Sequence, residues 1–251
     1  MTLRDKQIVL TRPRRQSAEL EEELQRHGAR VHLTPLIRTE PIHPEGLAAA
    51  VARLAQFDWL VFTSANGVAY FHEQFAAVSA QMPAEIRIAA IGPATAGAVE
   101  RYGWSVSLLP RSSSSEGLVE AFLQFPVKGK HFGLFVAERT RGILPAALTA
   151  MEARVTVIAV YRTVPDEAGI AALQALPWDR IDAVVFASGS AAEIFAARRP
   201  EGARRRGIRH CALGAATAQR MSQLGLRADL VAGETSAQGV VGVLEEGLGE
   251  R

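Results

Sequence analysis

An internal repeat is the feature that most constrains the fold. Residues 61–71 read VFTSANGVAYF and residues 184–195 read VVFASGSAAEIF, so the same apolar run, small polar loop and helix-like run occur twice, about 124 positions apart. Residues 86–122 likewise align with residues 208–244 at an offset of about 122 positions. A repeat of this length predicts two halves with the same order of strands and helices.

Short apolar runs alternate with segments of helical periodicity, which is the pattern of an α/β protein with parallel sheets. Ten strands are predicted, too many for one compact sheet of this kind, so the pattern favours two sheets. The predicted strands are residues 7–11, 30–35, 59–63, 87–91, 105–109, 131–136, 154–161, 183–187, 209–213 and 228–231. Helical spacing is clear at residues 18–26, 46–55, 95–101 and 215–223.

Composition argues against several functional classes. The 251-residue chain has one cysteine, Cys211, and six scattered histidines, so neither an internal disulfide nor a structural zinc site is expected. The amino terminus is basic and polar, and no run approaches the roughly 18 apolar residues of a membrane helix. The chain is therefore predicted to be cytoplasmic and to have no membrane partner.

Arginine supplies 25 of the 28 basic residues, although the formal net charge is only +2. Such a bias suits bidentate binding of carboxylate or phosphate, but base composition or a warm habitat also produces it. One basic cluster is made of Arg198, Arg199, Arg204, Arg205, Arg206 and Arg209. Because no nucleic-acid motif accompanies this cluster, it is interpreted as a solvated helix end rather than an RNA site.

Small polar and glycine-rich loops follow the predicted strands. They read TRPRRQS at 11, TSANG at 63, IGPAT at 91, RSSSSEG at 111, AERTRG at 137, ASGSA at 187, LGAAT at 213 and GETSAQG at 233. Parallel strands end at one edge of a sheet, where helix N-termini present free N–H groups and attract anions. For any single loop, N-capping explains the same residues better. Eight loops in two matched sets nevertheless favour a shared, anion-rich ligand.

Conventional catalytic machinery is absent from the sequence. It contains no Ser-His-Asp order with supporting loops, no phosphate loop ending in Gly-Lys-Ser, no GxGxxG fingerprint and no carboxylate cluster. An enzyme with this sequence is expected to bind and orient a substrate that carries its own reactivity.

The motifs together resemble the uroporphyrinogen III synthase family. They are VFTSANGV at 61, AIGPATAGAVERYG at 90, VYRT at 160, VVFASGSA at 184 and ALGAATAQRMSQLG at 212, followed by AGETSAQGVV. Their order and spacing carry the resemblance, which covers nearly the whole chain. It implies two similar parallel-sheet, flavodoxin-like α/β domains that arose by internal duplication and are joined by a two-stranded connector.

The resemblance also implies domain boundaries. One domain would hold residues 1–35 plus 165–251 and the other residues 41–159, with residues 36–40 and 160–164 as the connector. The repeat agrees with this division, because IRT at 37 aligns with YRT at 161.

The family's reaction would explain why the sequence has no conventional catalytic motifs. It takes hydroxymethylbilane, a linear tetrapyrrole with eight carboxylates, removes water from the terminal hydroxymethyl group, inverts the last pyrrole ring and closes the macrocycle. Without an enzyme, the same substrate closes uninverted. The resemblance therefore implies a lyase that holds a flexible polyanion in one conformation, in a cleft between two domains, with no metal or organic cofactor.

Site residues follow from the loops and the resemblance together. Tyr161 matches a recurring connector tyrosine and is a candidate general acid, although packing of the hinge explains it equally. Arg12 matches an arginine after the first strand, and it would also be unremarkable at the surface. Asn66 stands where some relatives have a basic residue, which puts a charged contact there in doubt. The expected substrate-binding residues are Arg12, Ser64, Ala65, Asn66, Gly67, Thr95, Ser188, Gly189, Ser190 and Thr217.

Two other functional classes remain open on the sequence alone. A two-lobed cytoplasmic module that binds or senses a small molecule would also have duplicated α/β halves. An RNA-binding protein using the arginine cluster is the weaker alternative. The main expectation is a monomeric enzyme with a small-molecule substrate and no nucleic-acid partner.

Overall fold

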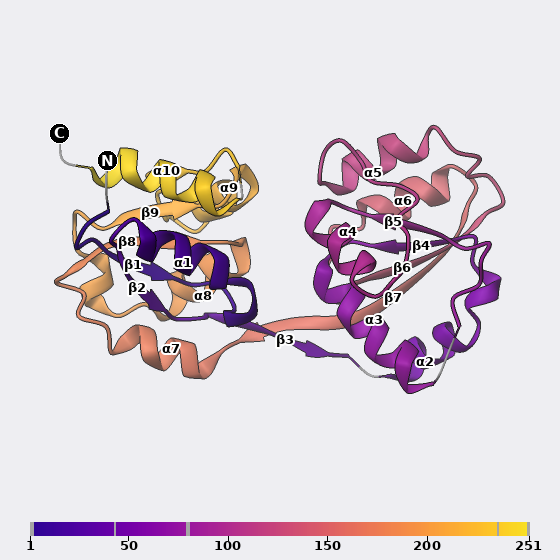
Figure 1. Cartoon of the computed structure of the whole chain (residues 1–251), viewed down its shortest axis with the longest axis horizontal. Helices are drawn as coiled ribbons and strands as arrows, with labels where there is room; N and C mark the ends of the chain where they lie inside the picture. The colour runs from indigo at the N-terminus through magenta and orange to yellow at the C-terminus, as the bar shows by residue number, and fades with distance from the viewer. Residues whose placement is uncertain (1–2, 43, 79–80, 235, 250–251) are drawn as a thin grey trace. The chain divides into compact units, whose positions relative to one another are not determined.

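The computed structural model describes residues 3–42, 44–78, 81–234 and 236–249. The chain divides into two compact units (Figure 1). Unit 1 comprises Met1–Arg38 and Val164–Arg251, and unit 2 comprises Thr39–Thr163. Thr235, in the GETSAQG loop, lies outside the described residues.

Unit 1 contains a five-stranded sheet with the order β10-β9-β8-β1-β2, in which every pair is parallel. Numbered from β1 within this unit, the order is 2-1-3-4-5, which is the flavodoxin-like arrangement. Its elements are β1 (Gln7–Leu10), η1 (Arg14–Gln16), α1 (Ala18–Arg26), β2 (Arg30–Leu33), α7 (Glu167–Gln174), β8 (Ile181–Phe186), α8 (Gly189–Arg198), η3 (Glu201–Arg204), β9 (Arg209–Ala212), α9 (Ala215–Gln223), β10 (Leu230–Val231) and α10 (Ala237–Leu248).

Unit 2 contains a second five-stranded sheet with the order β3-β7-β6-β4-β5. The pairs formed by β4, β5, β6 and β7 are parallel. Its elements are β3 (Ile37–Pro41), α2 (Pro44–Ala52), η2 (Leu54–Gln56), β4 (Trp59–Phe62), α3 (Ala65–Ala77), β5 (Arg87–Ala90), α4 (Pro93–Glu100), α5 (Ser115–Phe122), β6 (His131–Ala137), α6 (Ile143–Ala150) and β7 (Arg154–Pro165).

The strands β3 and β7 both run across the boundary between the units. The amide of Ile42 donates to the carbonyl of Val160 at 3.2 Å, and the amide of Asp166 donates to that of Leu36 at 3.0 Å. A later residue of the β3 segment therefore pairs with an earlier residue of the β7 segment, so β3 and β7 are antiparallel. The sequence predicted residues 36–40 only as part of the connector, whereas β3 also forms the edge of the unit 2 sheet, next to β7.

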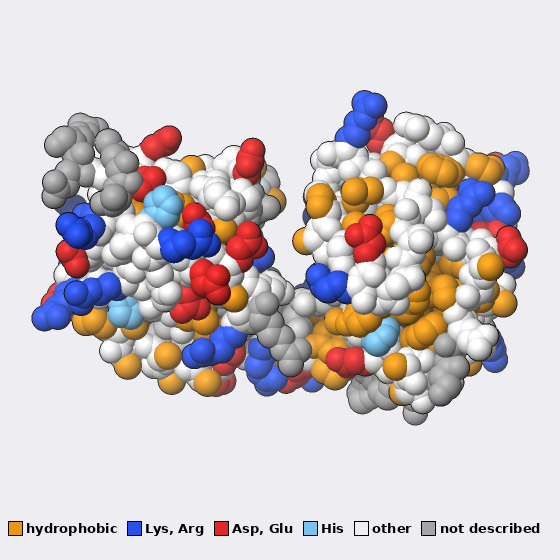
Figure 2. Space-filling model, viewed as in Figure 1, with side chains coloured by type: hydrophobic (Ala, Val, Ile, Leu, Met, Phe, Trp, Pro, Cys, Tyr) orange, Lys and Arg blue, Asp and Glu red, His pale blue; other side chains and the backbone are white. Residues whose placement is uncertain are grey.

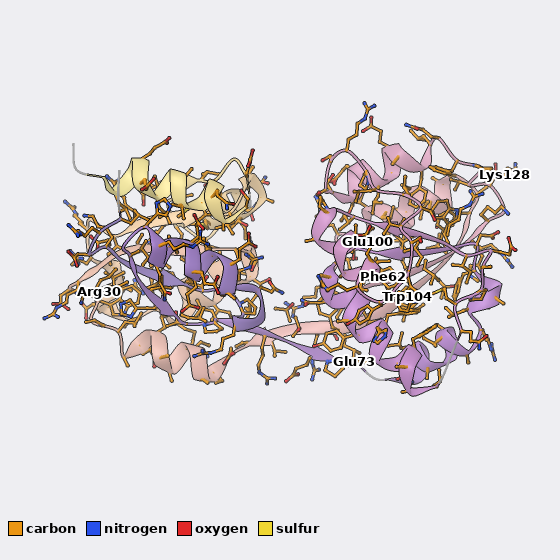
Figure 3. The ribbon with its side chains drawn as sticks, viewed as in Figure 1. Arg30, Phe62, Glu73, Glu100, Trp104 and Lys128 are labelled. Carbon is orange, nitrogen blue, oxygen red and sulfur yellow. The ribbon has the colours of Figure 1, made fainter. Side chains whose placement is uncertain are left out.

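Helices cover both faces of each sheet. In unit 1, α7, α8 and α9 pack on the face that carries Val184 and Phe186, whereas α1 and α10 pack on the face of Ala183 and Val185. In unit 2, α2, α3 and α4 cover the face of Phe62, which is labelled in Figure 3, while α5 and α6 cover the other face. On the visible faces in Figure 2, unit 2 shows more apolar side chains than unit 1.

The predicted strand at residues 105–109 is wrong. Only one bridge forms there, between Ala89 and Leu108, and Leu109 is 46% exposed. Pro110 follows and has no N–H to extend the pairing. The aligned segment in unit 1 is also short, because β10 contains only Leu230 and Val231.

Helix boundaries show smaller differences. The helices α1 and α9 have the predicted bounds. The predicted helix at 46–55 begins earlier, at Pro44, and ends at Ala52 before a short 3-10 turn. The helix expected from residue 95 begins at Pro93, a residue that suits the first helical turn because no intrahelical bond is needed there.

Each unit combines segments from both halves of the sequence. In unit 1, the β1–α1–β2 segment from the first half pairs with β8, so contacts join residues about 174 positions apart. In unit 2, the β6–α6–β7 segment from the second half pairs with β4. Four strands of each unit therefore follow the same spatial order, β9-β8-β1-β2 in unit 1 and β5-β4-β6-β7 in unit 2. The fifth strand differs, because β10 lies beside β9 in unit 1 whereas β3 lies beside β7 in unit 2.

We predict that residues 39–163 fold without the rest of the chain, because both hydrophobic clusters of unit 2 are made of residues from this segment. The isolated fragment should show helical circular dichroism and one cooperative urea transition. Residues 1–38 alone should not, because β8, the neighbour of β1, lies in the remote segment. A fragment 39–163 without a cooperative transition would contradict this.

Candidate functional site

In each unit, one pair of neighbouring strands marks the point from which successive strands are added in opposite directions across the sheet. In sheets of this kind, ligands bind outside the carboxyl ends of these two strands. In unit 1 these strands are β1 and β8, which are followed by Arg12 and by the Ser188–Ser190 loop. In unit 2 they are β6 and β4, and the Ser64–Gly67 loop follows β4. The structure therefore places most of the predicted binding residues at these two edges, each within its own unit.

The Ser64 loop is an N-cap with a close backbone approach. Ser64 has extended backbone angles, and its Oγ accepts a hydrogen bond from the Gly67 amide at 3.0 Å. A Cβ atom at Gly67 would lie only 3.1 Å from the carbonyl oxygen of Phe135, which belongs to β6. Gly67 therefore lets β6 pack closely against the start of α3. Ala65 and Asn66 lie half-buried in the first turn.

The same combination recurs at other helix starts. In four cases, a cap side chain accepts from the amide of a glycine three residues later. At each glycine the carbonyl oxygen of a residue outside the helix lies closest to where a Cβ would be. Sequence reasoning missed this S/D-x-x-G signature. The pairs are Ser64 with Gly67, Ser114 with Gly117, Asp166 with Gly169, and Ser236 with Gly239.

Tyr161 lies behind the Ser64 loop. Its side chain is buried, 8% exposed, and its hydroxyl donates to Ser64 Oγ at 2.9 Å. The ring stacks on Tyr70 with a centroid distance of 5.7 Å, and the Tyr70 hydroxyl bonds to Thr39 Oγ1 at 3.0 Å. The sequence predicted Ser64 and Tyr161 separately, but it did not predict their contact or the roles of Tyr70 and Thr39.

Burial raises the pKa of the Tyr161 phenol, because the charged phenolate would lose hydration. The hydrogen bond with Ser64 acts in the opposite direction and is the smaller effect. Tyr161 is therefore protonated throughout the neutral range.

The Ser188 loop of unit 1 has the same cap but different surroundings. Ser188 Oγ accepts from the Ala191 amide at 3.3 Å. A Cβ at Gly189 would lie 2.7 Å from Cγ of Arg220, so the glycine makes room for this arginine from α9. Arg220 forms an ion pair with Glu193. Ser190, in contrast, is exposed at the start of α8.

Arg12 is half-buried at the carboxyl end of β1. Its Nε is buried and has no hydrogen-bond partner among the described residues. Burial lowers the pKa of the guanidinium, and the nearby Glu19 partly opposes that shift. A guanidinium remains charged in proteins, so Arg12 retains a positive charge that would gain from an anionic partner.

Thr95 and Thr217 occupy equivalent positions in the first turns of α4 and α9, and both are buried. Thr217 Oγ1 donates to the Leu213 carbonyl at 3.5 Å. The N-cap residue of each helix is a glycine, Gly92 or Gly214, so no side chain caps either helix. Their first-turn amides, rather than the threonine hydroxyls, are therefore the groups at the edge.

A second loop of unit 2, residues 111–117 with the sequence RSSSSEG, lies close to the uncapped start of α4. A Cβ at Gly92 would lie 2.5 Å from Oγ of Ser113, so only glycine allows this approach. The sequence pointed to both loops but did not place Ser113 against Gly92, because nothing in the local pattern reports a contact between loops.

Among the described residues, no three His, Cys, Asp or Glu side chains are grouped as metal ligands. Within the same residues, no helix is long and apolar enough to cross a membrane.

The family model for uroporphyrinogen-III synthase HemD matches residues 18–242. The chain belongs to the uroporphyrinogen-III synthase family. The uroporphyrinogen-III synthase of Synechococcus elongatus is 33% identical over 181 residues, which are 68% of this chain and 67% of that protein. The enzyme of Chlorobaculum parvum is 23% identical over 231 residues, 90% and 92% of the two chains.

A solved structure supports the fold. A mutant uroporphyrinogen III synthase from Thermus thermophilus aligns with a TM-score of 0.70, covering 98% of this chain and 100% of that chain at 21% identity. The family's two-domain α/β architecture therefore matches the two α/β units seen here, and the α/β class with parallel sheets that the sequence predicted is confirmed.

The raised pKa of Tyr161 predicts a pH-dependent contribution to stability. Because the folded state prefers the neutral phenol, this contribution is complete below the unfolded pKa of about 10 and is lost as the pH rises through the higher folded value. At neutral pH, Tyr161→Phe should lower the free energy of unfolding by about 1 kcal/mol through the lost hydrogen bond.

Urea unfolding of both proteins between pH 8 and 11 tests this. The stability difference between wild type and Tyr161→Phe should shrink above about pH 10. A difference that stays constant over this range would show that the phenol does not ionise less readily in the folded protein. Both proteins retain Cys211, whose pKa burial raises to about 12, so its contribution cancels in the comparison.

Proposed function

We propose that this chain catalyses the cyclisation of hydroxymethylbilane to uroporphyrinogen III, with loss of water and inversion of the last ring, in tetrapyrrole biosynthesis. The observation that carries the proposal is the family match across residues 18–242. The enzyme is a lyase that needs neither a metal nor an organic cofactor for this reaction. It acts in the cytoplasm as a monomer, without a nucleic-acid or membrane partner.

The geometry of the edges supports a polyanionic substrate. Each unit offers a serine-capped loop together with an uncapped helix start, which are α3 with α4 in unit 2 and α8 with α9 in unit 1. Free N–H groups and the positive end of the helix dipole favour carboxylates. The acetate and propionate groups of the substrate are bound by these amides and by Asn66, Ser188 and Ser190.

Arg12 supplies the charged contact in this scheme. Its buried Nε has no partner among the described residues, and a carboxylate would supply one. Gly67 and Gly189 act indirectly, because they allow the close packing that holds the loops in place. Thr95 and Thr217 contribute through the backbone of their helix starts.

Catalysis then consists chiefly of choosing which pyrrole carbon attacks. The substrate closes by itself without inversion, so the protein must hold the last ring where the inverted bond forms faster. Many hydrogen bonds to carboxylates, each aligned by a rigid sheet edge, supply that orientation.

Incubation of purified protein with freshly prepared hydroxymethylbilane tests the function. Chromatography should show that uroporphyrinogen III predominates over the type I isomer formed in a heat-inactivated control. If only type I forms at the uncatalysed rate while the protein binds the tetrapyrrole, the chain is a binding module and the proposal is wrong.

Distributed binding predicts modest effects of single substitutions. One hydrogen bond to a charged group is worth about 1.5 to 3 kcal/mol, so Ser188→Ala or Ser190→Ala should lower kcat/KM by roughly ten- to a hundredfold at most. Ser188→Thr, which keeps a hydroxyl, is the matched control and should lose less. Complete loss of turnover in a Ser188 or Ser190 variant that retains the wild-type circular dichroism would contradict distributed binding.

A further inference from the structure

Ser64 Oγ accepts two hydrogen bonds within unit 2. One comes from the Gly67 amide at 3.0 Å and the other from the Tyr161 hydroxyl at 2.9 Å. A serine hydroxyl has two acceptor lone pairs and one donor hydrogen. Both lone pairs are therefore occupied, and the Ser64 hydrogen must point away from Gly67 and Tyr161.

The direction of the bond between the two hydroxyls follows from their acidity. A phenol is the stronger donor, because its O–H is far more acidic than that of an aliphatic alcohol. Tyr161 therefore donates and Ser64 accepts. Ser64 is half-buried at the carboxyl edge of β4, whereas Tyr161 is only 8% exposed behind it. A substrate at this edge meets the hydroxyl of Ser64 first.

We propose that Ser64 is the proton donor to the leaving hydroxyl of the substrate, and that Tyr161 is a positioning residue that orients the Ser64 hydrogen. This inference rests on the proposed function and reverses the roles expected from the sequence for these two residues. Ser64 was expected to bind substrate, and Tyr161 was a candidate general acid for which hinge packing was an equal explanation.

The dehydration step balances with this assignment. The C–O bond of the hydroxymethyl group breaks, its electron pair goes to the oxygen, and that oxygen takes the Ser64 proton and leaves as water. Ser64 takes the phenolic proton of Tyr161 along their hydrogen bond. The adjacent pyrrole N–H, which becomes acidic as the carbon loses its oxygen, returns one proton to the pair. The substrate has then lost one molecule of water, and Ser64 and Tyr161 are restored.

The surroundings make Ser64 a better donor than an isolated serine. An oxygen that accepts hydrogen bonds becomes a stronger donor through its own hydrogen, because chains of such bonds polarise one another. The start of α3 adds a positive partial charge at the same position. Stacking on Tyr70, which is itself bonded to Thr39, holds the Tyr161 ring in place.

Unit 1 provides an internal comparison. The repeat aligns Ser188 with Ser64, and Ser188 also caps its helix. The residue aligned with Tyr161 is Ile37, which packs against the apolar core of unit 1 and has no hydroxyl. The orientation of the Ser188 hydrogen is therefore not fixed by a phenol. Only the edge of unit 2 combines the cap with such a partner in the described residues.

Five variants separate proton donation from capping and from packing. Ser64→Asn keeps a good N-cap but has no hydroxyl, and Ser64→Thr keeps both. Tyr161→Phe removes only the phenolic hydroxyl, and the double variant Ser64→Asn/Tyr161→Phe tests whether the two residues act together. Asp166→Asn is the control, because it exchanges one good N-cap for another at the start of α7, outside the proposed binding residues.

The expected result is a loss of kcat with little change in KM. Ser64→Asn should lower kcat by roughly a hundred- to ten-thousandfold, the range for general acid catalysis, while Ser64→Thr stays within about tenfold of wild type. Tyr161→Phe should cost less than Ser64→Asn and should have no further effect in the double variant. Asp166→Asn should change kcat by less than about tenfold.

The inference is overturned if Tyr161→Phe lowers kcat more than Ser64→Asn and does so equally in the double variant, because Tyr161 would then act on the substrate directly. It also fails if Ser64→Asn turns over as fast as wild type. Wild-type protein assayed in parallel distinguishes these outcomes from failure of the proposed function, since that failure would leave wild type without type III product.

Discussion

Burial of both faces of each sheet is the constraint on which the rest of the structure depends. Helices cover Val184 and Phe186 on one side of β8 and Ala183 and Val185 on the other, so residues 183–186 of the strand offer no side chain to a ligand. Polar chemistry is confined to the loops after the strands, where the backbone changes from strand to helix. This explains why the candidate residues lie in short loops scattered through the sequence and yet fall at one edge of each unit.

The same constraint shows why much of the fold could be predicted. Buried parallel strands are continuous apolar runs, so β4 and β8 were recognisable, and the helices α1 and α9 have clear apolar spacing. The strand predicted at residues 105–109 was wrong because a single buried leucine, Leu108, satisfied the pattern without enough partners for a strand. The antiparallel pairing of β3 depends on the path of the chain, which local pattern does not report.

The candidate site was predictable as a set of loops but not as a set of contacts. Ser64 and Ser188 follow from the repeated motif, yet the bond from Tyr161 to Ser64 joins residues 97 positions apart. The contact of Arg220 with Gly189 is equally remote from local sequence, because it requires α8 and α9 to pack side by side. The differences between the two halves of the repeat are also informative, since Tyr161 and Ile37 occupy aligned positions but have different side-chain chemistry.

The separation of β1 from β8 has a consequence for synthesis on the ribosome. The first strand, helix and second strand emerge first, but β8 begins only at Ile181. At about 5 to 20 residues per second, the segment waits roughly 7 to 30 seconds for its partner, while all of unit 2 emerges and can fold in the meantime. During this interval Ile8 and Leu10, fully buried in the finished protein, have no sheet to join. Chaperones that shield nascent chains would therefore meet the amino-terminal segment of this protein for longer than the rest of it.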